Sequence, residues 1–282
     1  MGLPQVIQDL LDNGVHFGHL SKHWNPKMKK FIFGKKKNVF IIDLEKTEKC
    51  LETAKEFARK TAQDGEQILF VSTKKQTREA IKEAAETCNM LYINERWVGG
   101  FLTNFPTIRG RIKWYLELTE KKANGDLEKI PRKEAVALNR EWDKMDRNYR
   151  GVKNIQKLPG CVFVVDPKKE AACIKEAVKL GIPIVALIDT DSDPDLITYP
   201  IPGNDDAIRS VQYISMALGK AIKEGAEKGE ALLREKAAAD LAAAAEEIKL
   251  KEPDVEVFET IEEEIVEKEK APAVKKAKLI KE

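Results

Sequence analysis

The chain has 282 residues, of which 43% are hydrophobic, so it is long enough for one large or two modest domains with a buried core. Its 49 lysines and arginines against 47 aspartates and glutamates give a formal net charge of +2, which looks too balanced for a nucleic-acid-binding protein. However, residues 1–223 carry 38 basic and 30 acidic side chains, whereas residues 224–282 carry 11 and 17. A basic body with an acidic tail favours a polyanion as the partner of the body.

Membrane and secreted classes are excluded by local composition. No stretch approaches the roughly 18 apolar residues of a spanning helix, and the first residues lack the basic and apolar parts of a signal peptide. The four cysteines, Cys50, Cys88, Cys161 and Cys173, lie far apart and form no close pair of the kind used for zinc or redox exchange. We therefore expect a soluble, cytoplasmic protein whose cysteines are reduced and buried.

Short apolar runs alternate with amphipathic helical patterns along the body. The runs are residues 39–42, 68–71, 91–93, 161–165 and 184–188, and helical patterns cover residues 47–62 and 76–88. Runs that are apolar on successive residues suit strands covered on both faces, as in a parallel sheet. The pattern predicts a doubly wound α/β fold, closed by a final helix that begins after residues 204–206.

A long insertion, residues 94–160, separates the third and fourth apolar runs. Within it, apolar or neutral positions recur at steps of three and four: 105, 108, 112, 115 and 119, then 135, 138, 142, 145 and 149. This spacing predicts a short antiparallel coiled-coil hairpin, with two ordinary core helices as the alternative. We expect an α/β platform over residues 1–103 and 158–225, the hairpin over 104–157, and a helical and then disordered acidic tail over 226–282.

Three patterns suggest metal or nucleotide chemistry, and each lacks a necessary part. His16, His19 and His23 have no nearby cysteine and no regular helical spacing. The Gly99–Gly100 pair follows a strand but matches neither phosphate-loop pattern, so we interpret it as a tight turn. We therefore expect neither a metal ion nor a cofactor.

The acidic run at residues 189–195 (DTDSDPD) is the third pattern. Pro194 and Pro200 stand where a calcium loop needs glycine and a bidentate glutamate. An Asp-x-Asp magnesium site in a nucleotide- or sugar-nucleotide-dependent enzyme remains the alternative function, because ligands of open α/β sheets bind beyond the carboxyl ends of the strands.

Two basic zones favour RNA more strongly. Residues 22–37 interleave lysines with aromatic residues, and residues 104–157 hold 14 basic and 8 acidic side chains. Lysine and arginine neutralise phosphates, and aromatic rings stack on bases, although a charge run is often only a solvated surface. The candidate RNA-binding residues are Lys22, His23, Trp24, Lys27, Lys29, Lys30, Lys35, Lys36, Lys37, Lys74, Lys75, Arg96, Asn104, Arg109, Arg111, Lys113, Arg150 and Lys153.

Eight segments carry a family resemblance that extends over about residues 5–225. They are residues 14–19 (GVHFGH), 24–28 (WNPKM), 31–34 (FIFG), 42–47 (IDLEKT), 96–104 (RWVGGFLTN), 182–186 (IPIVA), 189–195 (DTDSDPD) and 201–209 (IPGNDDAIR). In this order they resemble bacterial small-subunit ribosomal protein two. Relatives often carry tyrosine where this chain has His23, and the acidic extension past about residue 230 is longer than in many of them.

The resemblance implies a flavodoxin-like α/β domain with an inserted antiparallel coiled-coil hairpin and no catalytic activity. It implies a structural constituent of the small ribosomal subunit that binds ribosomal RNA, contacts neighbouring small-subunit proteins, and helps to dock the multi-OB-fold protein that captures messenger RNA. On this basis the acidic run and the glycine pair are expected to be fold determinants or contact loops.

Overall fold

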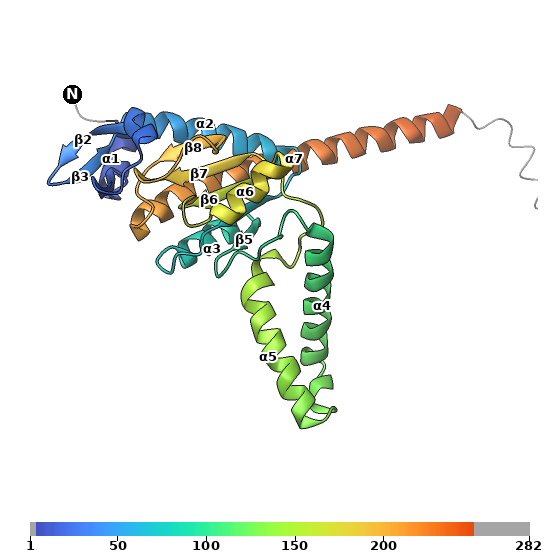
Figure 1. Cartoon of the computed structure of the whole chain (residues 1–282). Coiled ribbons are helices and arrows are strands. Elements are labelled where there is room, and N and C mark those ends of the chain that lie inside the picture. Colours follow the sequence, from blue (N-terminus) through green and yellow to red (C-terminus); the bar gives the residue numbers. More distant parts are fainter. Residues whose placement is uncertain (1–3, 251–282) are drawn as a thin grey trace, which may run out of the picture. The chain divides into compact units, whose positions relative to one another are not determined.

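Five parallel strands form the central sheet of the protein (Figure 1). The computed structural model describes residues 4–250, without the side chains of residue 128 and residues 237–250. The strands are β4 (Ile68–Val71), β5 (Leu91–Ile93), β6 (Cys161–Val165), β7 (Ile184–Ile188) and β8 (Tyr199–Pro202). Their order, β5-β4-β6-β7-β8, is the order of flavodoxin-like sheets, with the second strand at one edge and the first beside it. The expected α/β class is confirmed.

Helices cover both faces of this sheet. Successive strand residues point to opposite faces, so alternate residues of each strand pack against different helices. Ile68 and Phe70 pack with α2 (Leu44–Gln63), α3 (Arg78–Thr87) and α7 (Ile208–Leu250). Leu69 and Val71 pack with α6 (Ala171–Leu180) and with the start of α4 (Phe105–Ala123). The helices predicted over residues 47–62 and 76–88 and after residues 204–206 are therefore confirmed, and each begins or ends within a few residues of the prediction.

A second, smaller sheet lies near the N-terminus and is antiparallel. It consists of β1 (Phe17–Leu20), β2 (Ile32–Lys36) and β3 (Val39–Ile42), in the order β1-β3-β2. The prediction that residues 39–42 belong to the parallel sheet is wrong. Lys37 and Asn38 both adopt positive φ values, 47° and 65°, which close a tight hairpin between β2 and β3 and turn β3 back along its predecessor.

Strand β8 was not predicted, because prolines occupy two of its four positions. The backbone N–H of Gly203 donates to Ile188 O of β7 (2.9 Å), so alternate residues of β8 face β7. Pro200 and Pro202 lie at the intervening positions and face the free edge, where a missing N–H costs no sheet hydrogen bond. On that edge the Thr47 hydroxyl of α2 donates to Pro202 O at 2.7 Å.

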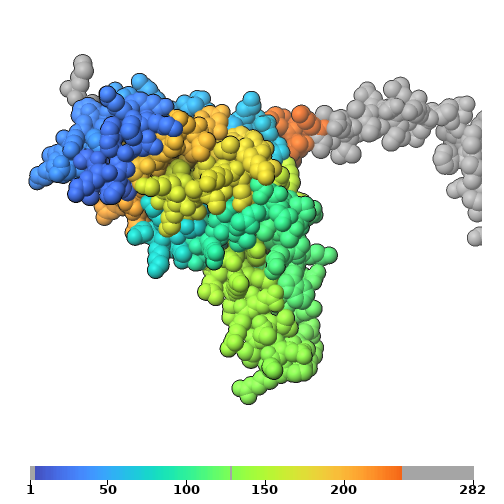
Figure 2. Space-filling view, viewed as in Figure 1, coloured from blue at the N-terminus to red at the C-terminus, as the bar shows by residue number. Residues whose placement is uncertain are grey.

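Helices α4 and α5 (Arg132–Tyr149) occupy the insertion between β5 and β6 and extend away from the sheet (Figures 1 and 2). The Tyr115 hydroxyl donates to Asp146 (2.7 Å), and Trp142 Nε1 donates to Thr119 Oγ1 (2.9 Å), so the two helices are hydrogen-bonded to each other at two successive turns. All ten positions of the predicted seam are buried or half-buried. Coiled-coil packing in the strict sense stays a prediction.

Short helical segments complete the described chain: α1 (Gln5–Asp12), η1 (Pro26–Phe31), η2 (Asp126–Glu128) and η3 (Arg150–Val152). The chain divides into two units, residues 1–230 and 231–282, and the helix expected over residues 226–250 is the distal part of α7. The acidic segment expected to be disordered lies outside the described residues. Within residues 4–250, no helix combines the length and the apolarity needed to cross a membrane. The four cysteines are free thiols, and all except the half-buried Cys50 are buried.

One carboxylate fixes the loop that leads from β5 to α4. Glu176 of α6 accepts hydrogen bonds from Trp97 Nε1 (3.0 Å), Gly100 N (2.8 Å), Leu102 N (3.0 Å), and the amide and hydroxyl of Thr103 (3.1 and 3.2 Å). The φ of +82° at Gly100 requires glycine and confirms the predicted tight turn. Helix α4 begins two residues after Thr103, so this contact determines where the inserted helices start.

The ionised form of Glu176 is the one that the loop stabilises. Partial burial by itself raises the pKa of Glu176, but the hydrogen bonds from Trp97, Thr103, Gly100 and Leu102 outweigh burial and hold this pKa below its ordinary value. A carboxyl group whose pKa is lowered by folding stabilises the folded state above its unfolded-state pKa. That contribution is lost as the pH falls through the folded-state pKa.

Replacing this carboxylate should therefore destabilise the protein at neutral pH. In Glu176→Gln, an amide NH2 faces backbone donors that then lack an acceptor, and we expect the free energy of unfolding to fall by roughly 1–3 kcal/mol. Urea unfolding at pH 7 measures this change, and the difference from wild type should shrink in acid. Lys175→Gln, on the exposed side of the same helix, is the control. Equal urea midpoints for Glu176→Gln and wild type at pH 7 would contradict this role.

Candidate nucleic-acid interface

Four unpaired lysines gather where β2 turns into β3. Lys35, Lys36 and Lys37 are exposed along the end of β2 and in the turn. Ser21 N donates to Asn38 O (2.8 Å), which brings exposed Lys22 beside the turn. None of the four has an ion-pair partner among the residues that the structure describes. We call Lys22, Lys35, Lys36 and Lys37 the lysine tip.

The other candidates of this segment are more constrained. Lys27 is held by Asp193 (2.8 Å) and Asp195, and the hydrogen bond with Asp193 raises the pKa of Lys27. Lys29 and Lys30 are exposed on η1, and His23 is exposed. The half-buried ring of Trp24 lies 5.1 Å from that of Phe40.

The aromatic residues of the segment differ in accessibility. Phe31 is buried and unavailable for stacking, whereas Phe33 on β2 is 80% exposed. Of the described residues in the small sheet, Phe17 and Leu20 on β1 are also about half exposed. This sheet therefore offers both unpaired positive charge and apolar surface.

A second basic surface lies at the base of α4. Arg109 and Lys113 on α4 and Lys153 after η3 line a groove of about 810 Å3. Its lining contains no acidic side chain among the described residues, and its apolar part comes from Phe105, Ile112, Leu116 and Ile155. We call this the helix-base groove.

The remaining candidates of the insertion and its approach lie near this groove in sequence, but none of them lines it. Arg111, Arg96 and Asn104 are exposed, and Asn104 Oδ1 accepts a hydrogen bond from Thr107 (2.9 Å) in the first turn of α4. Arg150 is half-buried, with Nη2 4.0 Å from a Glu95 carboxylate oxygen. Lys75 is exposed at the start of the loop after β4.

A polar hollow of about 490 Å3 adjoins the helix-base groove. It lies between the end of α3, the start of β5 and η3, and Lys153 and Asn154 line both cavities. Its other polar lining residues include Gln67, Lys82, Asn89 and Arg150. Sequence reasoning missed Gln67, Lys82 and Asn89, because they come from separate segments and no local motif marks them.

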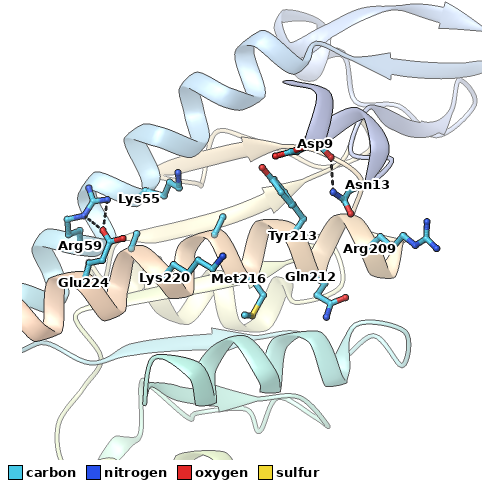
Figure 3. A pocket seen from close by; sticks show the side chains of 12 residues that line it. Asp9, Asn13, Lys55, Arg59, Arg209, Gln212, Tyr213, Met216, Lys220 and Glu224 are labelled. Atoms are coloured by element: carbon cyan, nitrogen blue, oxygen red, sulfur yellow. Dashed lines mark hydrogen bonds and ion pairs between the residues drawn. The ribbon is translucent and has the colours of Figure 1, made fainter. Parts of the chain in front are cut away.

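A third hollow, of about 630 Å3, lies between α1, α2 and α7 (Figure 3). Its lining mixes cations with the acids Asp9 and Glu224, and Arg59 is held by Glu224 at 3.2 Å. Arg209 and Lys220 also line it. Because the carboxylates offset much of this positive charge, this hollow is a weaker phosphate site than the helix-base groove.

The carboxyl ends of the parallel strands, where α/β enzymes bind ligands, are occupied by internal ion pairs. Lys74, after β4, lies 2.8 Å from Asp166, 2.9 Å from Asp205 and 3.0 Å from Asp206, and is only 11% exposed. Burial by itself lowers the pKa of Lys74, but Asp205 and Asp166 outweigh burial and raise it. This lysine was predicted to bind RNA, and its three carboxylates leave little of its charge for a phosphate.

The acidic run after β7 is neutralised in the same way. His19 Nδ1 lies 2.8 Å from Asp189, and Lys168 lies 2.9 Å from Asp191. Asp193 is paired with Lys27. Each of these three aspartates therefore contacts a basic side chain from another segment of the chain.

The three histidines do not form one site. His19, Asp205 and Asp206 have ligand atoms within 4.8 Å of one another, so of the described residues they are the group that could hold a metal ion. Hydrogen bonding to Asp189 raises the pKa of His19 to about 9 against the effect of burial, and burial raises the pKa of Asp205 to about 7 against the opposing effect of Lys74. His16 and His23 lie outside this group.

Comparison with known proteins identifies a consistent set of relatives. The family model described as ribosomal protein S2 matches residues 10–225. A protein named small ribosomal subunit protein uS2 from Dictyoglomus thermophilum is 51% identical over 233 residues, which cover 83% of this chain and 93% of that protein. Proteins of the same name from Dictyoglomus turgidum (50% identical, 83% and 93% covered) and Coprothermobacter proteolyticus (51% identical, 79% and 83% covered) are similar.

Removing the Lys74 ammonium should destabilise the fold. Lys74→Met leaves the carboxylate of Asp205, which is 1% exposed, without its cation, and we expect a loss of about 3–5 kcal/mol. Lys75→Met, one residue further on and exposed, should leave the free energy of unfolding nearly unchanged. Urea unfolding of both variants provides the comparison. If Lys74→Met kept wild-type stability and lost only RNA binding, Lys74 would be a phosphate ligand rather than a structural residue.

Proposed function

The chain belongs to the ribosomal protein S2 family, and from this premise we propose that it binds small-subunit ribosomal RNA through the lysine tip and the helix-base groove. Members of the family are structural proteins of the small ribosomal subunit. The chain is therefore a structural constituent of that ribonucleoprotein particle, acts in translation and is not an enzyme. The alternative of a nucleotide- or sugar-nucleotide-dependent enzyme is wrong.

One observation carries the assignment of the RNA surface: four exposed lysines gather at the lysine tip with no carboxylate of the described residues to balance their charge. Lys27 and Lys74 have their charge balanced by nearby carboxylates, whereas the lysine tip has no such partner among the described residues. Unbalanced positive charge attracts phosphates and releases their counterions on binding. Specificity then comes from the shape of the folded RNA and from neighbouring proteins, because phosphate contacts carry little sequence information.

The inserted helices form the second part of this proposal. We infer that residues 104–157 act as an antiparallel coiled-coil hairpin on the α/β platform of residues 1–103 and 158–225. Arg109, Arg111 and Lys113 lie on exposed faces of α4 near its start, close to the platform. In this proposal the platform is rigid and the hairpin reaches into the particle. The proposed location of the protein is the small ribosomal subunit in the cytoplasm.

Docking of the multi-OB-fold protein that captures messenger RNA is a further part of the proposal. The exposed side chains of Phe17, Leu20 and Phe33 support it, because large apolar side chains exposed on one small sheet are typical of surfaces that a protein partner covers. Other neighbouring small-subunit proteins complete the set of partners.

Reversing the charge of the lysine tip should weaken incorporation into the particle. We expect Lys35→Glu, Lys36→Glu and Lys37→Glu together to lower affinity for small subunits stripped of this protein by at least about tenfold, with the salt dependence falling by about 0.7 to 0.9 per lost phosphate contact. Co-sedimentation over a salt series measures both quantities. Lys49→Glu, Lys175→Glu and Lys179→Glu, an equal charge change on α2 and α6, is the control. Identical binding of the two triple variants would count against the tip.

Truncating the most exposed aromatic side chain should affect the protein partner instead. In Phe33→Ala, we expect co-sedimentation of the multi-OB-fold protein to weaken by roughly tenfold, because burying a phenylalanine contributes about 1.5–3 kcal/mol. Incorporation of the chain itself should not change. Leu180→Ala, which removes a similarly apolar side chain that is 41% exposed on α6, serves as the control. A variant that retained the partner fully would remove Phe33 from the docking surface.

A further inference from the structure

The helix-base groove and the polar hollow are two parts of one track. Lys153 and Asn154 line both, so the cations Arg109 and Lys113 on one side continue through Lys153 to Arg150 and Lys82 on the other. Glu86 is the acid of the hollow, and its carboxylate accepts a hydrogen bond from the Tyr92 hydroxyl at 3.4 Å. Lys82 lies 3.9 Å from Glu79 and Arg150 lies 4.0 Å from Glu95, so the cations of the track without an ion-pair partner among the described residues are those of the groove, Arg109, Lys113 and Lys153.

The groove has the composition of a site for unpaired nucleotides. Its apolar surface comes from Phe105, Ile112, Leu116 and Ile155. Its cations are Arg109, Lys113 and Lys153. An RNA duplex presents sugars and phosphates outward and keeps its base faces stacked inside, so it gains nothing from an apolar floor. An unpaired strand offers base faces to apolar and aromatic side chains and phosphates to cations.

Two residues that line the hollow carry polar atoms that lack partners. Gln67 Oε1 and Arg150 Nε are shielded from water and have no hydrogen-bond partner. Gln67 Oε1 is an acceptor and Arg150 Nε is a donor, and leaving such buried groups without a hydrogen bond is unfavourable. The edge of a nucleobase carries donors and acceptors side by side, and the volume of about 490 Å3 lies within the range of small-molecule sites.

We propose that this track binds an unpaired stretch of small-subunit ribosomal RNA, with bases on the apolar floor, phosphates on Arg109, Lys113 and Lys153, and one nucleobase in the polar hollow. The inference rests on the proposed binding of ribosomal RNA and specifies its form. Because Gln67 Oε1 and Arg150 Nε are shielded in the free protein, a base reaches them only after these half-buried side chains turn. Binding in the hollow therefore involves side-chain rearrangement without movement of the sheet.

Gln67→Leu separates recognition from stability. The Gln67 Oε1 atom has no partner in the free protein, so its removal should leave the urea midpoint unchanged or raise it. Binding of labelled oligouridylate or oligoadenylate to the full chain should nevertheless weaken several-fold. A variant that lost stability and kept RNA binding would show that Gln67 is structural and would overturn the placement of a base in the hollow.

The groove is tested with Lys113→Gln combined with Lys153→Gln, both exposed and without ion pairs among the described residues. We expect affinity for the unpaired oligonucleotides to fall about tenfold and the salt dependence to fall by about 0.7 per lost phosphate contact. Lys175→Gln combined with Lys179→Gln is the matched control. Blunt RNA duplex of equal phosphate count should bind the wild type more weakly. Equal binding of duplex, with equal sensitivity to the variants, would overturn the proposal.

The assembled particle supplies the final test. A photoreactive benzoylphenylalanine at Gln156, which lines the groove, should crosslink within small subunits to a ribosomal RNA segment that is unpaired. A crosslink to a ribosomal protein or to a paired helix would overturn the inference. If the lysine-tip variant fails to incorporate while the groove variants bind unpaired RNA normally, this inference fails and the proposed binding of ribosomal RNA through the lysine tip stands. If neither set has any effect, the proposed RNA surfaces fail together.

Discussion

The Glu176 carboxylate is the contact on which the placement of the inserted helices depends. Four backbone or side-chain N–H groups and one hydroxyl converge on it from the loop between β5 and α4. Because the loop is pinned to α6, the first turns of α4 are held against the segment that follows η3. The helix-base groove exists only while those two segments keep their separation. A hydrogen-bonded acid on the sheet domain thus shapes a basic surface that belongs mostly to the insertion.

The fold could be predicted where the sequence pattern has one physical explanation. Residues 68–71, 161–165 and 184–188 are apolar at every position because helices cover both sides of these strands. Residues 39–42 have the same composition but pair in the small antiparallel sheet, and only the turn at Lys37 and Asn38 distinguishes the two outcomes. Strand β8 was hidden because its prolines argue against a strand anywhere except at an edge.

The site could be predicted by segment but not by residue. Composition identifies the basic regions, yet it cannot show which cations are neutralised, because the partners are distant: Lys27 pairs with an aspartate 166 positions away and Lys74 with one 131 positions away. Residues such as Gln67 and Asn89 carry no signal of their own, since their role depends on a cavity assembled from several segments. Glu176 was missed for the same reason, because a glutamate on an amphipathic helix ordinarily faces solvent.

The prolines of β8 also affect the tendency of the chain to aggregate before it is incorporated into a small subunit. An edge strand with free N–H groups can recruit a strand from another molecule, which is a route to insoluble aggregates. At the free edge of β8 the two positions that would donate are prolines, and Thr47 already donates to the carbonyl oxygen of one of them. Newly synthesised copies at high local concentration therefore cannot readily pair a strand of another copy with this edge, whether or not RNA is bound.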